Sequence, residues 1–190
     1  KLEPNVISYN AGISACQKGG QWWHALSLLS ELVRATVEPT IISYNAAVSA
    51  CEKCGQWQIA LSLLAECRAV ELESDVIGYS AVISACEKGG QWPMALFVLT
   101  DLREARLEPD VVSYSAGVSA CEKGGQWWQA LVLLDELREV SIEPNTISFN
   151  SGISACEKRG QWWHAVSLLG EIVSVRLQPD VVSYSACISA

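Results

Sequence analysis

Apolar residues recur along the chain at intervals that predict pairs of α-helices. In each of two successive stretches they follow one another mainly at steps of three or four residues, which is the spacing of one helical face. These apolar positions are Val6, Tyr9, Ile13 and Cys16 in the first stretch and Trp22, Ala25, Leu26, Leu29 and Leu32 in the second. The start of the chain therefore predicts two amphipathic helices joined by a short turn.

The two-helix pattern returns every 35 residues without an insertion, as Tyr9, Tyr44 and Tyr79 illustrate. We number the positions of each repeat from 1 to 35. The repeats are 6–40, 41–75, 76–110, 111–145 and 146–180, with the tail of a preceding repeat expected at 1–5 and the start of a sixth at 181–190. We expect the chain to be a segment of a longer array that forms a single solenoid domain.

Glycines mark the turn between the two helices. Position 15 is glycine in every repeat and is expected to adopt a positive φ: Gly20, Gly55, Gly90, Gly125 and Gly160. Position 14 varies, since Cys54 and Arg159 replace glycine in two repeats, so only position 15 is expected to require glycine. Pro93 fits the first turn of a helix, which predicts that the second helix of its repeat begins near Gln91.

One pair of helices cannot bury both apolar faces, so neighbouring pairs must stack. The sequence therefore predicts an all-α fold, an α-solenoid of stacked helix-turn-helix repeats. The tryptophan at position 17 and the cysteine at position 11 are expected in the core. The second tryptophan of the "WW" pairs (Trp23, Trp128 and Trp163) is expected at the surface, where it could form a patch for a partner.

Composition limits the class of protein. Half of the 190 residues are apolar, which is too much for a disordered chain, and Ser, Gly, Glu or Lys interrupts every apolar run before the roughly 20 residues of a membrane span. We therefore expect no membrane span. Lys and Arg number 13 against 21 Asp and Glu, a formal net charge of −8.

The cysteines and histidines do not form a recognisable site. Most of the eight cysteines belong to one column of the repeat, which favours free buried thiols in a reducing compartment. Cys51 and Cys54 form a single CxxC without further ligands nearby, and His24 and His164 have no recurring nucleophile beside them, which favours surface histidines. We expect no metal, no cofactor and no enzymatic activity.

A second stripe runs along the first helix at positions 2, 5, 9 and 12. Position 2 is aliphatic (Ile7, Ile42, Ile77, Val112, Ile147 and Val182), and position 5 is Asn or Ser (Asn10, Asn45, Ser80, Ser115, Asn150 and Ser185). Position 13 is lysine in every repeat: Lys18, Lys53, Lys88, Lys123 and Lys158. This lysine is interpreted either as a solvated side chain that the helix dipole favours at the end of the helix, or as a contact to a phosphate.

The unit "VVSYSAGVSACEKGGQWWQALVLLDELREVSIEPN" resembles a pentatricopeptide repeat. The hydrophobic pair, the Ser-Tyr-Asn/Ser motif, the glycine turn, the "ALxLLxEL" segment and the closing Pro-Asp/Asn carry the resemblance, which covers the whole chain. The "GGQW" junction is a variant of the family's usual start of the second helix. The resemblance implies a right-handed α-solenoid.

The resemblance also implies binding of single-stranded RNA in a chloroplast or mitochondrion, with one base per repeat. In the family, positions 5 and 35 of a repeat choose the base, and position 2 residues of adjacent repeats sandwich it. The pairs here are Asn10 with Thr40, Asn45 with Asp75, Ser80 with Asp110, Ser115 with Asn145, and Asn150 with Asp180, while Ser185 opens the next repeat. The family's code then implies the preference pyrimidine-U-G-A-U from 5′ to 3′, for a role in RNA processing, stability, editing or translation.

The negative net charge favours an alternative, because affinity for RNA comes largely from neutralising phosphates. The array would then be a protein-binding scaffold, such as an accessory subunit of a large organellar complex. Its partner would bind the concave face or the exposed tryptophan patch. The sequence predicts no particular oligomeric state.

Overall fold

The computed structural model describes residues 5–72 and 74–190, and the regular elements within these ranges are all helices. Of the expected tail of a preceding repeat, residues 1–4 lie outside the described residues. The helices are α1 (Val6–Gly19), α2 (Trp22–Arg34), α3 (Ile41–Lys53), α4 (Trp57–Ala69), α5 (Val76–Lys88), α6 (Trp92–Glu104), α7 (Val111–Lys123), α8 (Trp127–Glu139), α9 (Thr146–Glu157), α10 (Trp162–Ser174) and α11 (Val181–Ser189). The predicted start of the second helix in the third repeat is confirmed, since Gln91 caps α6 and Pro93 lies in its first turn.

The residue that closes each 35-residue unit is the N-cap of the odd-numbered helix that follows. The side chain of Asp75, for example, accepts a hydrogen bond from the backbone N–H of Gly78 at 2.9 Å, and Asp110 does the same from Ser113 at 2.8 Å. This is an N-cap, which satisfies a backbone donor that the helix itself leaves free. Position 35 therefore belongs physically to the following helix.

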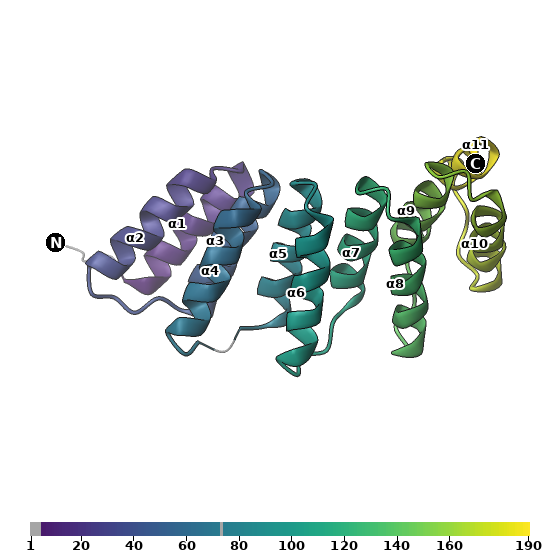
Figure 1. The fold of residues 1–190 in the computed structure, drawn as a ribbon. Helices are drawn as coiled ribbons and strands as arrows, with labels where there is room; N and C mark the ends of the chain where they lie inside the picture. The colour runs from purple at the N-terminus through teal and green to yellow at the C-terminus, as the bar shows by residue number, and fades with distance from the viewer. Residues whose placement is uncertain (1–4, 73) are drawn as a thin grey trace.

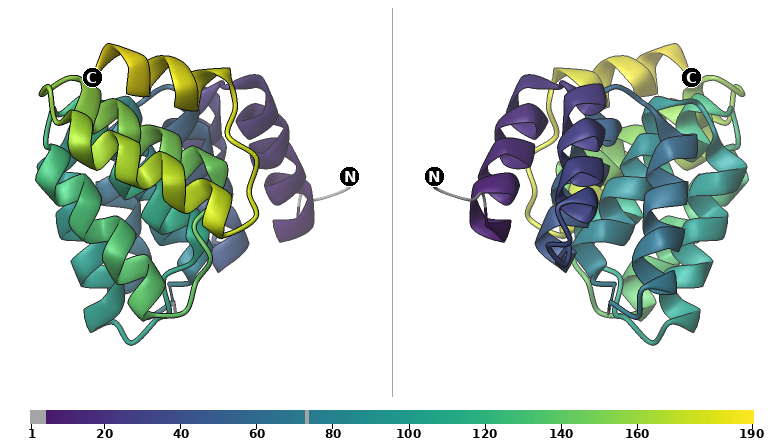
Figure 2. Two further views of the ribbon diagram at one scale, coloured as in Figure 1. Left: turned by 90° about the vertical axis from the view of Figure 1, so that its right-hand side faces the viewer. Right: turned by 90° about the vertical axis from the view of Figure 1, so that its left-hand side faces the viewer.

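The helices form two layers. Each odd-numbered helix contacts the next odd-numbered helix, whereas across residues 5–72 and 74–190 no two even-numbered helices make backbone-level contacts. The even-numbered helices instead pack on their own and the next odd-numbered helix. Close stacking of one layer and spreading of the other curves the array, with the odd-numbered helices on its inner, concave side. Figures 1 and 2 show the two layers and the changing tilt of successive helices, with the termini at opposite ends.

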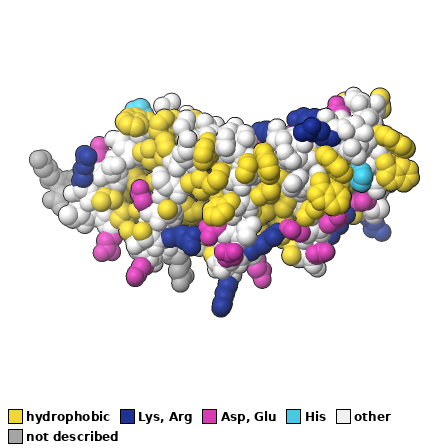
Figure 3. Space-filling model, in the orientation of Figure 1, with side chains coloured by type: hydrophobic (Ala, Val, Ile, Leu, Met, Phe, Trp, Pro, Cys, Tyr) yellow, Lys and Arg dark blue, Asp and Glu magenta, His cyan; other side chains and the backbone are white. Residues whose placement is uncertain are grey.

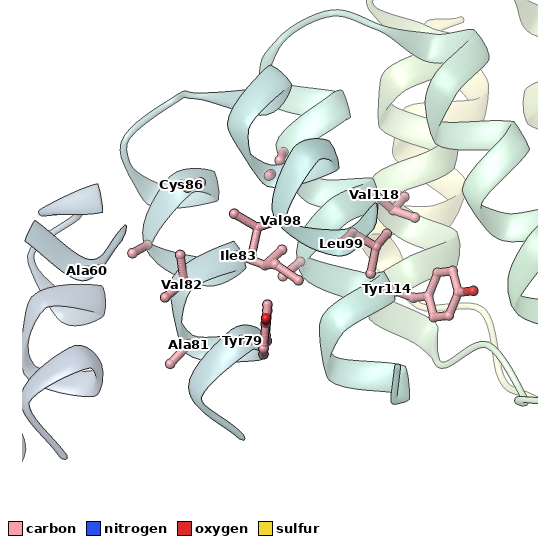
Figure 4. Packing of buried hydrophobic residues seen from close by; sticks show 14 of the residues in the cluster. Ala60, Tyr79, Ala81, Val82, Ile83, Cys86, Val98, Leu99, Tyr114 and Val118 are labelled. Atoms are coloured by element: carbon pink, nitrogen blue, oxygen red, sulfur yellow. The ribbon is translucent and has the colours of Figure 1, made fainter. Parts of the chain in front are cut away.

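The stacked layers bury a continuous core, as the solenoid prediction requires. Cys51, Cys86, Cys121 and Cys156 are fully buried, which confirms the prediction for the cysteine column in these repeats, while Cys16 in the first repeat is partly buried. Figure 4 shows how the layers meet: Ile83 of α5 and Val98 of α6 point toward each other between their helices.

The tryptophan at position 17 is less buried than the sequence suggested. Trp22, Trp57, Trp92 and Trp127 are only half-buried against the core, and Trp162 remains 58% exposed. The reason is their place at the first residue of an outer helix, where the ring lies over the rim of the core. The prediction that this column packs in the core is therefore confirmed for the first four repeats, where the tryptophan is partly buried against the core, and was wrong for Trp162.

The turn glycines adopt the expected conformation, but position 14 does not behave as predicted. At position 15, φ lies between 63° for Gly55 and 68° for Gly90. At position 14, a Cβ on Gly89 would lie 2.5 Å from the Trp57 ring, and one on Gly124 would lie 2.2 Å from Trp92. The tryptophan of the preceding repeat therefore requires glycine at these two places, contrary to the sequence-based interpretation.

Two repeats carry a side chain at position 14 instead. In both, this side chain donates a hydrogen bond to the glycine turn of the preceding repeat: Cys54 Sγ donates to the carbonyl of Gly20 at 3.2 Å, and Arg159 Nε donates to that of Gly125 at 3.0 Å.

The two histidines differ in their exposure. At the junction of the fourth and fifth repeats, the ring of the half-buried His164 lies 5.2 Å from that of Trp127, measured between ring centroids. The prediction of surface histidines thus holds for His24 and was wrong for His164, which the neighbouring tryptophan partly covers.

The outer face combines apolar and charged groups. Trp23, Trp128 and Trp163 are 58–67% exposed, as expected for the second tryptophan of each pair. Figure 3 shows hydrophobic side chains across the face of the even-numbered helices, with charged side chains gathered below them. Ion pairs of arginine with an acidic residue of the next repeat bridge these helices: Arg68 with Asp101, Arg103 with Glu136, and Arg138 with Glu171.

Among the described residues, no helix combines the length and apolar character that crossing a bilayer requires. The same part of the chain contains no group of three or more His, Cys, Asp or Glu side chains placed to hold a metal ion. All eight cysteines are free thiols.

Candidate nucleic-acid interface

The aliphatic column at position 2 projects from the inner helices into solvent. These side chains are 53–72% exposed although each is a valine or isoleucine: Ile7, Ile42, Ile77, Val112, Ile147 and Val182. Exposed large aliphatic groups in a regular row are a signal of a binding surface, because burial of their apolar area would be favourable. The row lies beside the Asn and Ser residues of position 5 on the same helices.

The side chains of every predicted pair of positions 5 and 35 lie within hydrogen-bond distance of each other. Asn45 Nδ2 donates to both carboxylate oxygens of Asp75, at 2.9 and 3.0 Å, and Asn150 does so to Asp180, at 3.1 and 3.0 Å. The other pairs are Asn10 with Thr40 at 3.3 Å, Ser80 with Asp110 at 3.4 Å, and Ser115 with Asn145 at 3.4 Å. The structure thus brings together all five pairs that the resemblance implies.

Asn and Ser at position 5 offer different groups. The Ser80 hydroxyl donates to the backbone carbonyl of Val76 at 2.7 Å, and Ser115 donates to Val111 at 2.6 Å, so both hydroxyls stay against their own helix and are buried. The longer asparagine reaches its partner through the amide nitrogen. Ser185 is exposed and donates to the carbonyl of Val182 at 3.2 Å.

The hydrogen bonds also keep the closing carboxylate ionised. The backbone N–H and hydroxyl of Ser183, followed by the amide of Asn150, lower the pKa of Asp180 below its usual value because they stabilise the charged form. An ionised Asp accepts but cannot donate hydrogen bonds. This pair therefore presents an amide donor beside a fixed acceptor.

A third residue completes each cluster, and the sequence interpretation missed it. Position 3 of the following repeat is serine at four of the five junctions: Ser43, Ser113, Ser148 and Ser183. Ser43 Oγ donates to Asn10 Oδ1 at 2.6 Å, and Ser113 Oγ lies 2.7 Å from Ser80 Oγ. The signal was present as a serine column in the sequence, but helix periodicity does not show that it faces the preceding repeat.

A pocket of about 290 Å³ opens at the second repeat. Ile42 and Ile77, the position 2 residues of adjacent repeats, both line it, together with Asn45 and Asp75. Two aliphatic side chains and a hydrogen-bonded polar pair are the elements that a flat, polar-edged ligand such as a nucleobase requires.

The lysines at position 13 are engaged with the neighbouring repeat. Lys88 pairs with Glu52 at 2.6 Å, Lys123 with Glu87 at 2.5 Å, and Lys158 with Glu122 at 2.5 Å, while Lys53 donates to the carbonyl of Lys18 at 3.1 Å. The ion pairs form a ladder along the ends of the inner helices. A phosphate at these lysines would have to compete with the glutamates.

Sequence and structure comparisons agree on one family. The sequence pattern of the pentatricopeptide repeat domain matches residues 1–54, 62–124 and 132–190, and that of a single pentatricopeptide repeat matches 42–69. No curated protein matches the chain.

Solved structures of this family have the same fold. Maize PPR10, in complex with an 18-nucleotide psaJ RNA element, is 28% identical over 98% of this chain, with a TM-score of 0.76. The chain spans 26% of that PPR10 chain, about a quarter of its length. The repeat domain of Arabidopsis thaliana PRORP1, a protein-only RNase P, in complex with tRNA, shares the fold with a TM-score of 0.79 at 13% identity, over 91% of both chains.

The pattern matches cover most of the 190 residues, and the α-solenoid with its two-helix units is the architecture of the matched structures. The chain therefore belongs to the pentatricopeptide repeat family.

Proposed function

We propose that this chain binds single-stranded RNA along its inner face, with one base per repeat and the preference pyrimidine-U-G-A-U from 5′ to 3′. The observation that carries the proposal is the close approach of positions 5 and 35, at 2.9–3.4 Å, in all five repeats. Each contact places two side chains of different hydrogen-bonding capacity side by side, next to exposed aliphatic groups.

The chemistry of the pairs supports base readout. In the Asn45–Asp75 pair one amide proton is bonded to the carboxylate, which leaves the second Nδ2 proton for a carbonyl of uracil. In the Ser80–Asp110 pair the hydroxyl is bound to its own helix, so the carboxylate is the main group left to accept from guanine N–H donors. The exposed Ile42 and Ile77 supply apolar surfaces on either side of a base in the 290 Å³ pocket.

The RNA complexes of PPR10 and of the PRORP1 repeat domain support the general part of the proposal. A place in RNA processing, stability, editing or translation in a chloroplast or mitochondrion follows from the family resemblance. The role that we propose is binding, carried by the polar pairs and the exposed aliphatic groups of the site.

A titration of the chain with RNA containing U-U-G-A-U, against a scrambled sequence of the same composition, tests the proposal. Measurements at two salt concentrations separate base readout from backbone attraction, because only the latter falls steeply with salt. We expect tighter binding of U-U-G-A-U at both concentrations. Equal affinity for both sequences would contradict readout by the pairs.

A protein-binding scaffold is the second candidate. The exposed Trp23, Trp128 and Trp163 and the net charge of −8 favour it, because aromatic side chains are enriched at protein interfaces and a polyanion is repelled. Failure of the chain to bind either RNA would favour this candidate.

A further inference from the structure

Two repeats carry the same pair but differ in the third residue of the cluster. Asn45 with Asp75 and Asn150 with Asp180 are chemically identical pairs, and both use Nδ2 as the donor. Position 3 of the following repeat is Gly78 beside the first pair and Ser183 beside the second. A code of positions 5 and 35 alone assigns the two repeats the same base with the same selectivity.

At the fifth repeat the asparagine amide is held at both ends. Ser183 Oγ accepts from the backbone N–H of Asp180 at 3.1 Å and donates to Asn150 Oδ1 at 2.5 Å. Asn150 Nδ2 in turn donates to Asp180. This closed ring fixes the amide plane. The same arrangement occurs at the first repeat, where Ser43 Oγ donates to Asn10 Oδ1 at 2.6 Å and Asn10 Nδ2 donates to Thr40 at 3.3 Å.

At the second repeat the ring is open. Gly78 has no hydroxyl to donate, so Asn45 is tied to Asp75 through Nδ2 and its Oδ1 lies where a serine side chain would be: a Cβ on Gly78 would be 2.7 Å away. The same pair lines the 290 Å³ pocket. The amide of Asn45 can pivot about its bond to Asp75 and turn Oδ1 toward a donor in the pocket.

We propose that position 3 of the following repeat is a third specificity-determining position, which sets how strictly an asparagine at position 5 distinguishes uracil from cytosine. The inference rests on the proposed RNA binding. A fixed amide presents only its Nδ2 donor, which suits the carbonyl acceptors of uracil. A pivoting amide also presents Oδ1, which accepts from the exocyclic amino group of cytosine. The second repeat therefore prefers uracil but tolerates cytosine, whereas the fifth repeat selects uracil more strictly.

The test measures binding of the chain to three RNAs: U-U-G-A-U and its single variants with cytosine at the second or the fifth nucleotide. We expect the unaltered chain to discriminate against cytosine about threefold to tenfold more strongly at the fifth nucleotide than at the second, which is the effect of one restrained hydrogen bond. Equal discrimination at both nucleotides would overturn the inference.

Reciprocal substitutions provide matched controls in the same molecule. Gly78→Ser should raise uracil selectivity at the second nucleotide by this factor and leave selectivity at the fifth unchanged. Ser183→Gly should lower uracil selectivity at the fifth nucleotide and leave selectivity at the second unchanged. Gly78 lies within α5 at a position where other repeats have serine, and Asn45 Oδ1 is the end of a flexible side chain that can shift, so Gly78→Ser should fold. Ser183→Ala keeps the Cβ but removes the hydroxyl, and should act like Ser183→Gly.

The outcomes separate this inference from the proposed function. A preference for U-U-G-A-U over the scrambled RNA, with selectivity at the second nucleotide unaltered by Gly78→Ser, would overturn the inference and leave the function standing. A chain that binds no RNA, or shows no base preference, would overturn both. A Gly78→Ser effect of equal size at the fifth nucleotide would also overturn the inference, because it would reflect a general change of the groove.

Discussion

Asn45 Nδ2 donates to both carboxylate oxygens of Asp75, 30 residues later in the chain, at 2.9 and 3.0 Å. Asn45 lies within α3, whereas Asp75 is the N-cap of α5 and also binds the backbone N–H of Gly78. The two members of the pair therefore sit on different helices of the inner layer. Each proposed base site lies at a junction between repeats, so the proposed readout requires correct stacking of neighbours.

The ion-pair ladder should limit affinity for RNA. Lys123 is paired with Glu87 at 2.5 Å, so Glu87→Gln frees a cation at the end of the inner layer. We expect tighter RNA binding by about twofold to fivefold and a salt dependence steeper by about 0.7 in log–log slope, the value for one more phosphate contact on a single strand. Stability should change by less than about 1 kcal/mol, because the lysine is 44% exposed.

The matched control for this change is Glu139→Gln, at the end of an outer helix and with the same change of charge. RNA affinity should respond much less to it. An equal response of both variants would show that net charge, and not the position 13 lysine, limits binding.

Glycine at position 14 should be required where a tryptophan packs against it. In Gly124→Ala the new Cβ would lie 2.2 Å from the Trp92 ring, which must then move, so we expect a loss of about 1–3 kcal/mol in the free energy of unfolding. Gly19→Ala is the control, since its Cβ would meet Gln21 at an ordinary 3.6 Å. Urea unfolding of both variants measures the difference, and similar losses in the two would contradict the role of Trp92.

The buried cysteines should resist alkylation in the folded chain. Burial raises the pKa of the Cys51, Cys86 and Cys156 thiols to about 11 and that of Cys121 to about 12. At pH 8 we expect iodoacetamide to modify the exposed Cys54 in the native protein and these four residues only after unfolding. Mass spectrometry of the labelled peptides gives the result, and rapid native labelling of Cys121 would contradict its burial.

The same shifts predict how stability depends on pH. The thiol pKa values are higher in the folded chain than the ordinary 9.0, so the unfolded chain loses its protons first as the pH rises. Their contribution to the free energy of unfolding is complete below about pH 9 and declines as the pH approaches 11 to 12. In Cys121→Ala, the free energy of unfolding should decline less steeply between about pH 9 and pH 12. An unchanged pH dependence would show that groups other than this thiol cause the decline.

The sequence predicted the elements within a repeat better than the contacts between repeats. Helix periodicity and the glycine at position 15 were sufficient for the two helices and their turn, because these are local features. The packing of Trp92 on Gly124, 32 residues away, and of Ser183 on Asn150, 33 residues away, depends on how far one repeat is rotated against the next. Periodicity within a helix contains no information about that rotation.

The ends of the outer helices show a second limit of the sequence pattern. Position 31 adopts a positive φ in every complete repeat although it is never glycine: Thr36, Glu71, Arg106, Ser141 and Arg176. Hydrogen bonds close this turn, since Arg106 N donates to the carbonyl of Arg103 at 2.9 Å and Leu107 N donates to that of Leu102 at 3.3 Å. These hydrogen bonds require a positive φ at position 31 and outweigh the preference of non-glycine residues for a negative φ. No single residue type therefore marks this position in the sequence.

The most direct test of the reading pairs exchanges one residue and one base together. Ser115 is paired with Asn145, and Ser115→Asn would give this repeat an amide like that of Asn45. Affinities of both proteins for U-U-G-A-U, U-U-G-U-U and U-U-G-C-U complete the cycle. The account predicts that the unaltered chain prefers adenine at the fourth nucleotide and the variant prefers a pyrimidine there, with a coupling energy of about 1–3 kcal/mol. The same base preference in both proteins would contradict recognition by the pairs.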